Sequence, residues 1–207
     1  MKKTILFALI SAFVFSLSGF AQRSTMKEII KDAKKQAKEL KKAGWVTVPG
    51  ALPLERQLED MYIKKNLELD DEGISKWIIG ESNPIGEFYD AAKLQANALA
   101  RTSVAEQMNA EITQIIETSL GNKQLTGDEA ASVAQVIAKG KELVSGTLGR
   151  TVPVFEAYRK LPNGNVEIMF RVAYSTKTGM AKAKEAYRDA LEQSIKGLGE
   201  KFDKELK

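Results

Sequence analysis

A serine and a lysine three positions apart are the first residues of this chain whose spacing could support catalysis. Ser24 and Lys27 match the Ser-x-x-Lys spacing of serine-lysine acyl transferases and penicillin-binding proteins. The pair also overlaps a predicted helix start, where Ser and Thr commonly act as caps, and the spacing arises easily by chance. The sequence therefore favours a helix start here over a nucleophile.

Other familiar reactive groups are missing from the composition. The chain contains neither Cys nor His. It therefore cannot form a thiolate nucleophile, a Ser-His-Asp triad, a disulfide or a His-based metal site. Carboxylate pairs and lysine bases remain, and none stands at a recognisable spacing. We expect no catalytic residue, no cofactor and a non-enzymatic protein.

An acidic stretch is the strongest candidate for a metal site. Glu68, Asp70, Asp71 and Glu72 carry the oxygen ligands that Ca²⁺ prefers. The alternating ligand spacing of an EF-hand loop is absent. The stretch therefore predicts an acidic turn ahead of Gly73, and no metal site is expected.

Three bulky side chains are candidates for ligand binding. Trp45 and Trp77 fall in predicted strands, where they could stack on a sugar ring or pack within the fold. Arg101 is the one charge in an otherwise apolar helical stripe, where a charge is costly unless it is paired. It could hold a ligand carboxylate, but an acidic partner within the same domain is favoured. The predicted stripe contains Ala91, Leu94, Ala98, Arg101, Ala105, Met108, Ile112 and Ile115.

The first 21 residues have the pattern of a secretory signal peptide. Lys2 and Lys3 precede an apolar run over residues 5–17, and small residues lead to an expected cleavage after Ala21. The run is too short to span a bilayer, and Gln22 stands where a lipoprotein has its acylated Cys. The segment predicts a periplasmic or secreted protein with no transmembrane segment.

The remaining charge is nearly balanced. Loss of Lys2 and Lys3 lowers the 31 basic residues to 29, against 27 acidic ones. No aromatic residues are interleaved with the basic ones, so no nucleic-acid partner is expected. Seven Lys and three acidic residues do gather in the predicted helix over residues 26–42. A basic amphipathic helix can lie on an anionic membrane, but the missing aromatic anchors favour a solvent-exposed helix face.

Periodicity and turn residues predict an α+β domain over residues 22–207. Its helix-strand-helix part covers residues 22–75, and its core covers residues 76–207. We expect a small, largely antiparallel sheet with long helices packed on one face. Helices are predicted over residues 25–43, 53–67, 91–115, 126–144 and 179–202, and strands over residues 45–48, 76–80, 155–161 and 166–172. Thr25 with Glu28 and Thr126 with Glu129 predict capping boxes at two helix starts. Gly197 and Gly199 weaken the end of the last helix, whose predicted apolar stripe is Met180, Ala183, Tyr187, Leu191, Ile195, Leu198 and Phe202.

The last two strands predict a hairpin around Asn163 and Gly164. With Leu161 opposite Val166, two opposite-charge pairs share one face and apolar residues the other. That open face is the predicted partner-binding patch, and its strand edge could pair with a partner strand. The patch consists of Glu156, Tyr158, Met169 and Arg171.

Three segments carry a resemblance to a known family. They are the strand 77–80 that ends in Gly80, the Ala-rich segment 89–101 and the hairpin 157–174. Over residues 76–174 the chain resembles the twenty-kilodalton Helicobacter-type envelope lipoproteins and flagellum-associated outer-membrane proteins, though it lacks their acylated Cys. The resemblance implies a non-enzymatic envelope module that acts through protein contacts. We therefore expect an exported scaffold protein that binds envelope proteins and could form a homo-oligomer. The alternative is a small-molecule or glycan-binding protein.

Overall fold

The computed structural model describes residues 25–121 and 123–206. The predicted signal peptide and Ser24 lie outside them. The elements are α1 (Met26–Lys42), α2 (Leu54–Asn66), β1 (Trp77–Ser82), β2 (Ile85–Gly86), α3 (Tyr89–Leu120), α4 (Gly127–Ala138), α5 (Gly140–Thr147), β3 (Val152–Lys160), β4 (Val166–Ser175), α6 (Thr176–Ser194), α7 (Leu198–Lys201) and α8 (Asp203–Leu206).

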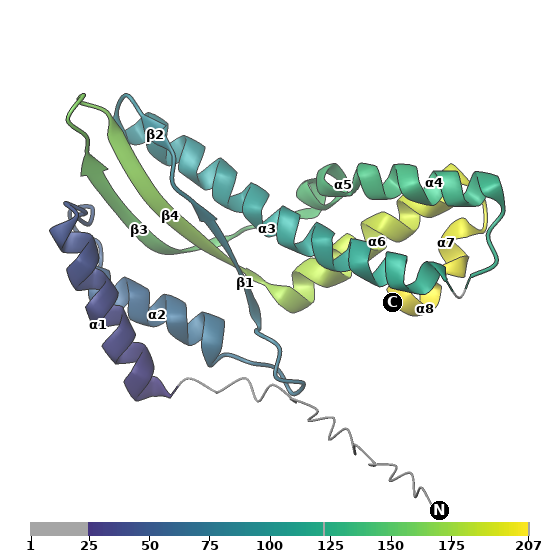
Figure 1. Cartoon of the computed structure of the whole chain (residues 1–207), viewed down its shortest axis with the longest axis horizontal. Coiled ribbons are helices and arrows are strands. Elements are labelled where there is room, and N and C mark those ends of the chain that lie inside the picture. The colour runs from purple at the N-terminus through teal and green to yellow at the C-terminus, as the bar shows by residue number, and fades with distance from the viewer. Residues whose placement is uncertain (1–24, 122, 207) are drawn as a thin grey trace, which may run out of the picture.

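The sheet is small and antiparallel, with β4 at its centre. β3 pairs with one side of β4, while β1 and the short β2 pair with different parts of its other side. Helix α3 runs from the sheet into a bundle formed with α4 to α8, so the molecule is elongated (Figure 1). This architecture confirms the predicted α+β class.

The N-terminal half of α3 packs unusually closely on the sheet. Ala92, Ala96 and Ala100 recur every four residues and are fully buried. A Cβ added at Gly80 would lie 2.1 Å from the Ala100 carbonyl oxygen. The Ser82 hydroxyl donates to the Ala96 carbonyl at 2.7 Å. The strand and the helix approach this closely because both present small side chains.

The predicted α3 stripe is wrong in its first half. Leu94 is 76% exposed, and Ala98 is also exposed. Both belong to a second apolar stripe on the opposite side of the helix, and the sheet packs on the alanine stripe instead. Further along, Ala105, Met108 and Ile112 of the predicted stripe are fully buried in the bundle, as expected.

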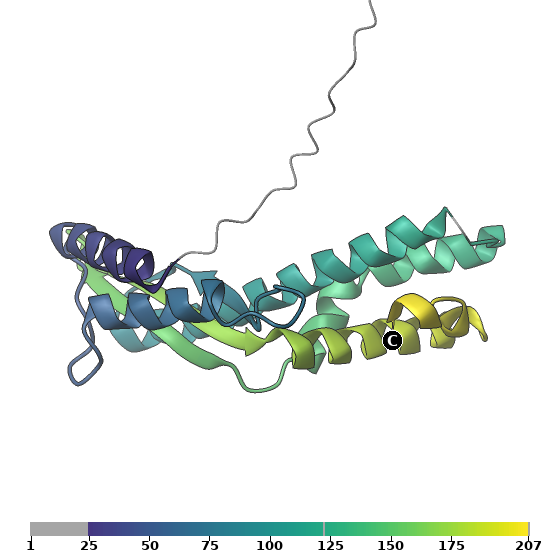
Figure 2. The same cartoon turned by 90° about the horizontal axis from the view of Figure 1, so that it is seen from below.

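The other face of the sheet is covered by α1 and α2, so helices flank both faces (Figure 2). The prediction placed helices on one face only. Thr25 and Glu28 form the predicted capping box of α1. The predicted strand over residues 45–48 forms a single bridge, between Val46 and Tyr158.

The hairpin exists, but its register differs by one residue from the prediction. Lys160 pairs with Val166, and Tyr158 pairs with Ile168. The Leu161 amide donates to the Asn165 carbonyl, which leaves a three-residue loop ending in Gly164 at φ +87°. A three-residue loop with a left-handed last residue is a common hairpin connection. A shift of one residue turns each side chain of β3 to the other face relative to β4.

The C-terminal helix ends earlier than its apolar stripe. Met180, Ala183, Tyr187 and Leu191 are buried as predicted, but α6 stops at Ser194. The predicted weakness at the following glycines is confirmed, because Gly197 adopts φ +83°.

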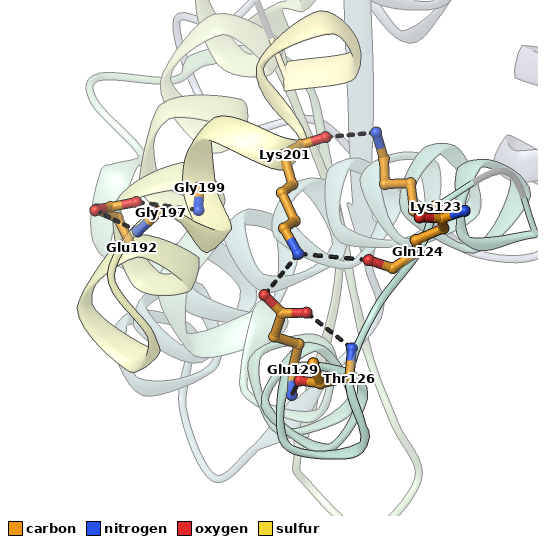
Figure 3. Close-up of polar contacts among 8 residues, drawn as sticks. All are labelled: Lys123, Gln124, Thr126, Glu129, Glu192, Gly197, Gly199 and Lys201. Carbon is orange, nitrogen blue, oxygen red and sulfur yellow. Dashed lines mark hydrogen bonds and ion pairs between the residues drawn. The ribbon is translucent and has the colours of Figure 1, made fainter.

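Polar contacts fix the segment that follows α6 onto the bundle (Figure 3). The amides of Gly197 and Gly199 donate to the Glu192 carboxylate at 2.8 and 3.2 Å. The Lys201 ammonium donates to Glu129 at 2.7 Å and to the Gln124 carbonyl at 3.4 Å. Glu129 also completes a capping box with Thr126, as predicted for the start of α4. One carboxylate therefore holds both the start of α4 and α7.

We expect this connection to weaken in acid. Lys201 lowers the pKa of Glu129 below its ordinary value of 4.5, and the amide of Thr126 adds to the effect. A carboxyl with a lower pKa in the folded state stabilises the fold above its unfolded-state pKa and loses that contribution as the pH falls through its folded-state pKa. Melting temperatures of the wild type and Glu129→Gln should therefore differ at about pH 6, and the difference should shrink steadily as the pH falls below 4.5. A constant gap across this range would contradict the assignment.

Candidate functional site

The four residues of the predicted partner patch lie on two different faces of the sheet. Glu156 and Tyr158 face α3, where the Tyr89 hydroxyl and the Lys93 ammonium both bond to the Glu156 carboxylate. The Tyr158 ring meets the Tyr89 ring edge to face at 5.3 Å between centroids. Burial, followed by the bond to Glu156, raises the pKa of Tyr89 above its ordinary value of 10.0. These side chains connect α3 to β3.

Met169 and Arg171 face α2 on the opposite side. The Arg171 guanidinium lies 5.2 Å from the centre of the Phe155 ring and pairs with Glu81 at 3.2 Å. Met169 packs beside the buried cluster that α1 and α2 form with Phe155. The prediction of one open face is therefore wrong, because the one-residue change of register separates its members and helices cover both faces.

Several outward-facing backbone groups at the sheet edges already have partners. The Gln57 carboxamide accepts from the Glu156 amide at 2.7 Å, and the Val46 backbone exchanges two bonds with Tyr158. On β1, the Gln107 side chain donates to the Ile79 carbonyl at 2.8 Å, and the Ser75 hydroxyl bonds to both backbone groups of Trp77. Side chains and loops that occupy an edge disfavour the addition of another strand.

Two of the three predicted ligand-binding residues have structural roles. Trp45 is only 5% exposed and packs in the cluster formed by α1, α2 and β3, with the Arg159 guanidinium 4.8 Å from its ring centre. Arg101 donates to the carbonyl oxygens of Leu148 and Gly149 at 3.2 and 3.0 Å. Its partner is internal as expected, although it is backbone carbonyl and not a carboxylate.

Trp77 lines a cleft at one end of the sheet. Trp77 pairs with Ser175 at one end of β4. Val46, the neighbour of Trp45, bridges to Tyr158 of β3, and Tyr158 pairs with Ile168 of β4. Seven positions along a strand correspond to about 23 Å, so the two tryptophans belong to different regions. Residues 81–86, which span the end of β1, a turn and β2, lie at the far end of β1 from Trp77.

This cleft has a volume of about 640 Å³, and we name it the Trp77 cleft. Pockets for small ligands commonly measure between about 300 and 1,000 Å³. The cleft lies where the loop before β1 and the start of α6 meet the C-terminal third of α3. Its lining residues are Glu68, Asp70, Asp71, Ile74, Ser75, Lys76, Trp77, Glu111, Ile115, Ser175, Thr176, Lys177, Met180 and Lys184.

The indole of Trp77 is held in one orientation. Its Nε1 donates to the Glu68 carboxylate at 2.6 Å, and the Lys64 ammonium lies 4.6 Å from the ring centre. Lys64 and Glu68 also form an ion pair at 3.4 Å. An aromatic ring fixed in this way loses little conformational freedom when a ligand stacks on it.

The loop beside Trp77 is itself well ordered. Asp70 accepts hydrogen bonds from the amides of Glu72 and Ile74 at 3.0 and 2.8 Å. Gly73, at φ +83°, allows the turn. The Thr176 hydroxyl donates to the Ser75 carbonyl at 2.8 Å, which attaches the loop to the start of α6. The acidic turn predicted here is confirmed. Within residues 25–121 and 123–206, no cluster of three or more acidic side chains is arranged to hold a metal ion.

The lining of the Trp77 cleft combines apolar surface with charges of both signs. Ile115 and Met180 supply apolar walls beside the indole, and Ile74 is 51% exposed. Lys177 and Lys184 bring positive charge from α6. Sequence patterns did not reveal the cleft as a unit, because its walls come from parts of the chain about one hundred residues apart. Among the lining residues, the sequence indicated Trp77 as a candidate for stacking on a ligand, and Glu68, Asp70 and Asp71 only as oxygen ligands of the type that calcium prefers.

Comparisons with known proteins gave no match among family models, curated proteins or solved structures. The resemblance to envelope lipoproteins therefore stays a prediction. Among the helices of the described residues, none has the length and apolar character that crossing a bilayer requires.

Proposed function

We propose that this chain is an exported, non-enzymatic binding protein that holds a small molecule or a glycan in the Trp77 cleft. The observation that carries the proposal is an oriented indole in a cleft of ligand size. Sugars and planar rings stack on aromatic faces, and the nearby apolar walls from Ile115 and Met180 extend that surface. Export rests on the signal-like pattern of residues 1–21.

The charged residues around the cleft favour a ligand that carries a polar or acidic group. Glu68 already accepts the indole N–H, and Asp70 already accepts two backbone amides. Lys76, Lys177 and Lys184 remain as nearby cations, and Asp71 and Glu111 as nearby anions. A ligand with a ring face and a carboxylate or several hydroxyls would use both kinds of lining.

In a panel of neutral sugars, acidic sugars and aromatic acids, we expect at least one compound to stabilise the folded protein. A ligand present at a hundred times its Kd stabilises the folded state by about 2.7 kcal/mol, which a thermal-shift assay detects easily. Trp77→Ala should abolish that shift. Asp60→Asn, in a separate groove beside the start of β3, should leave it unchanged. A hit that stabilises Trp77→Ala as strongly as the wild type would place the ligand elsewhere.

A protein-binding scaffold is the second candidate, and one observation favours it. Leu94 is 76% exposed on the outer side of α3, next to Ala91 and Ala98. This stripe continues into Ala105 and Met108, which the bundle covers. An envelope protein or a second copy could cover the open part. The ligand panel separates the two functions, since a pure scaffold gives no thermal shift with any compound.

A further inference from the structure

The charges of α1 are sorted around its axis. At about 100° per residue, its seven lysines fall within an arc of about 120°. Its three acidic residues fall in an adjacent, narrower arc, and the residues that pack against α2 and the sheet occupy the rest. We call the first arc the lysine face, and it consists of Lys27, Lys31, Lys34, Lys35, Lys38, Lys41 and Lys42.

The lysine face is exposed, and few of its charges form ion pairs with acidic side chains of the same protein. All seven residues are solvent-exposed. Within residues 25–121 and 123–206, Lys41 alone among them forms an ion pair, with Glu55 at 2.5 Å. Glu28 is engaged in the capping box, while Asp32 and Glu39 line a shallow cleft between α1 and α2. Positive charge therefore faces solvent along the whole helix.

Several of these lysines repel one another within the helix, and Glu28, Asp32 and Glu39 offset only part of that repulsion at spacings of three and four. Lys27 and Lys31, Lys31 and Lys35, Lys34 and Lys38, and Lys38 and Lys42 are each four residues apart. Like charges at this spacing destabilise a helix by about 0.2 to 0.5 kcal/mol per pair. A face that served only solubility would not require one sign of charge along about 25 Å of helix.

The apolar side of α1 is buried within the fold. Ile29, Ala33 and Ala37 are buried, and Leu40 packs against the same cluster. The helix therefore cannot insert an apolar face into a bilayer while the fold is intact. It lies at the outside of the sheet end of the molecule, where the lysine face can meet a surface (Figures 1 and 2).

We propose that the lysine face of α1 docks this protein onto an anionic lipid bilayer by electrostatic attraction, without insertion. Lysines that occupy about one third of the helix circumference along its whole length can reach a flat layer of negatively charged headgroups, and each basic residue near such a surface adds to the attraction. The face carries no aromatic residue on which a base could stack, as single-stranded nucleic-acid sites do. The missing aromatic belt fits adsorption, because insertion is the step that needs it.

The docking proposal is independent of the ligand proposal. None of the seven lysines lines the Trp77 cleft. Variants of the lysine face can therefore fail to bind vesicles while a cleft ligand still stabilises them, and Trp77→Ala gives the reverse pattern.

Vesicle co-sedimentation of the exported chain tests the proposal, after mass spectrometry has established its N-terminus. The wild type should bind vesicles containing about one-third phosphatidylglycerol and should not bind pure phosphatidylcholine. Replacing Lys31, Lys34, Lys35 and Lys38 by Gln should weaken binding on the order of 1,000-fold, and replacing them by Arg should preserve it. Added salt should release the wild type.

A matched quartet distinguishes the lysine face from net charge. Gln at Lys139, Lys160, Lys196 and Lys204, all exposed and outside α1, removes the same charge. This variant should bind within about twofold of the wild type. The Gln quartet on α1 should keep the melting temperature near that of the wild type, since the repulsion between lysines and their attraction to Glu28, Asp32 and Glu39 are lost together, and Gln and Lys have similar helix propensities. Equal losses in the two quartets, binding to neutral vesicles, or equally tight binding to a short DNA duplex would each overturn the proposal.

Discussion

Replacing Gly80 with Ala is expected to destabilise the protein by about 3 kcal/mol, although a single methyl group is added. The new Cβ would lie 2.1 Å from the Ala100 carbonyl oxygen and 2.6 Å from Cγ2 of Val104. The first of these atoms belongs to the backbone of α3, so a change of rotamer cannot relieve the contact. The helix must move away from β1, and its close packing over Ala96 and Ala100 is lost.

Thermal unfolding measures this effect directly. For a chain of this size, the expected loss corresponds to a decrease of roughly 10 °C in Tm. Gly146→Ala in α5 is the matched control, because a Cβ there has no neighbour within 4 Å. That variant should be neutral or slightly more stable, since Ala is the better helix former. A Tm for Gly80→Ala close to the wild type would show that α3 and β1 are less tightly packed than described.

Local sequence signals predicted the elements well. Both capping boxes, Thr25 with Glu28 and Thr126 with Glu129, mark the observed starts of α1 and α4. These boxes involve residues three positions apart, so the sequence contains both partners. The glycines after Ser194 likewise predicted the weak last part of the C-terminal helix. The α+β class follows from the order of such elements.

Contacts between segments far apart in the chain were harder to predict from the sequence. Two apolar stripes run along α3, and periodicity does not say which one packs on the sheet. The choice depends on Gly80 and Gly86, whose missing side chains admit Ala100 and Ala92. The Trp77 cleft was not predicted because its walls also come from distant segments: Ile115 and Met180 approach Trp77 only in the folded chain.

The hairpin register depends on a local detail that composition does not reveal. Charge pairing supported a four-residue loop, in which Lys160 is opposite Glu167. In the structure Arg159 is opposite Glu167, and their side chains form an ion pair at 2.7 Å. Both registers pair a basic with an acidic residue, so charge alone cannot distinguish them. The backbone of Gly164 at φ +87° makes the difference.

Engineered disulfides should distinguish the two registers, because a Cys pair should close only where its two residues are directly opposite each other. Directly opposite residues of antiparallel strands have Cα atoms about 4.5 to 5.5 Å apart, which lies within the range that a disulfide spans. The chain has no Cys, so each introduced pair can react only with itself or between molecules. We expect the variant with Cys at Arg159 and Glu167 to oxidise almost completely within the monomer.

The variant with Cys at Lys160 and Glu167 is the matched control, because it bridges the pair that the alternative register predicts. In the structure, Lys160 is opposite Val166, and its side chain points to the other face from Glu167. Its two thiols should stay free under the same mild oxidation, as read by intact mass and thiol titration of the monomer. If this pair closed and the other stayed reduced, Glu156, Tyr158, Met169 and Arg171 would share one face of β3 and β4, and the partner patch predicted from the sequence would regain its basis.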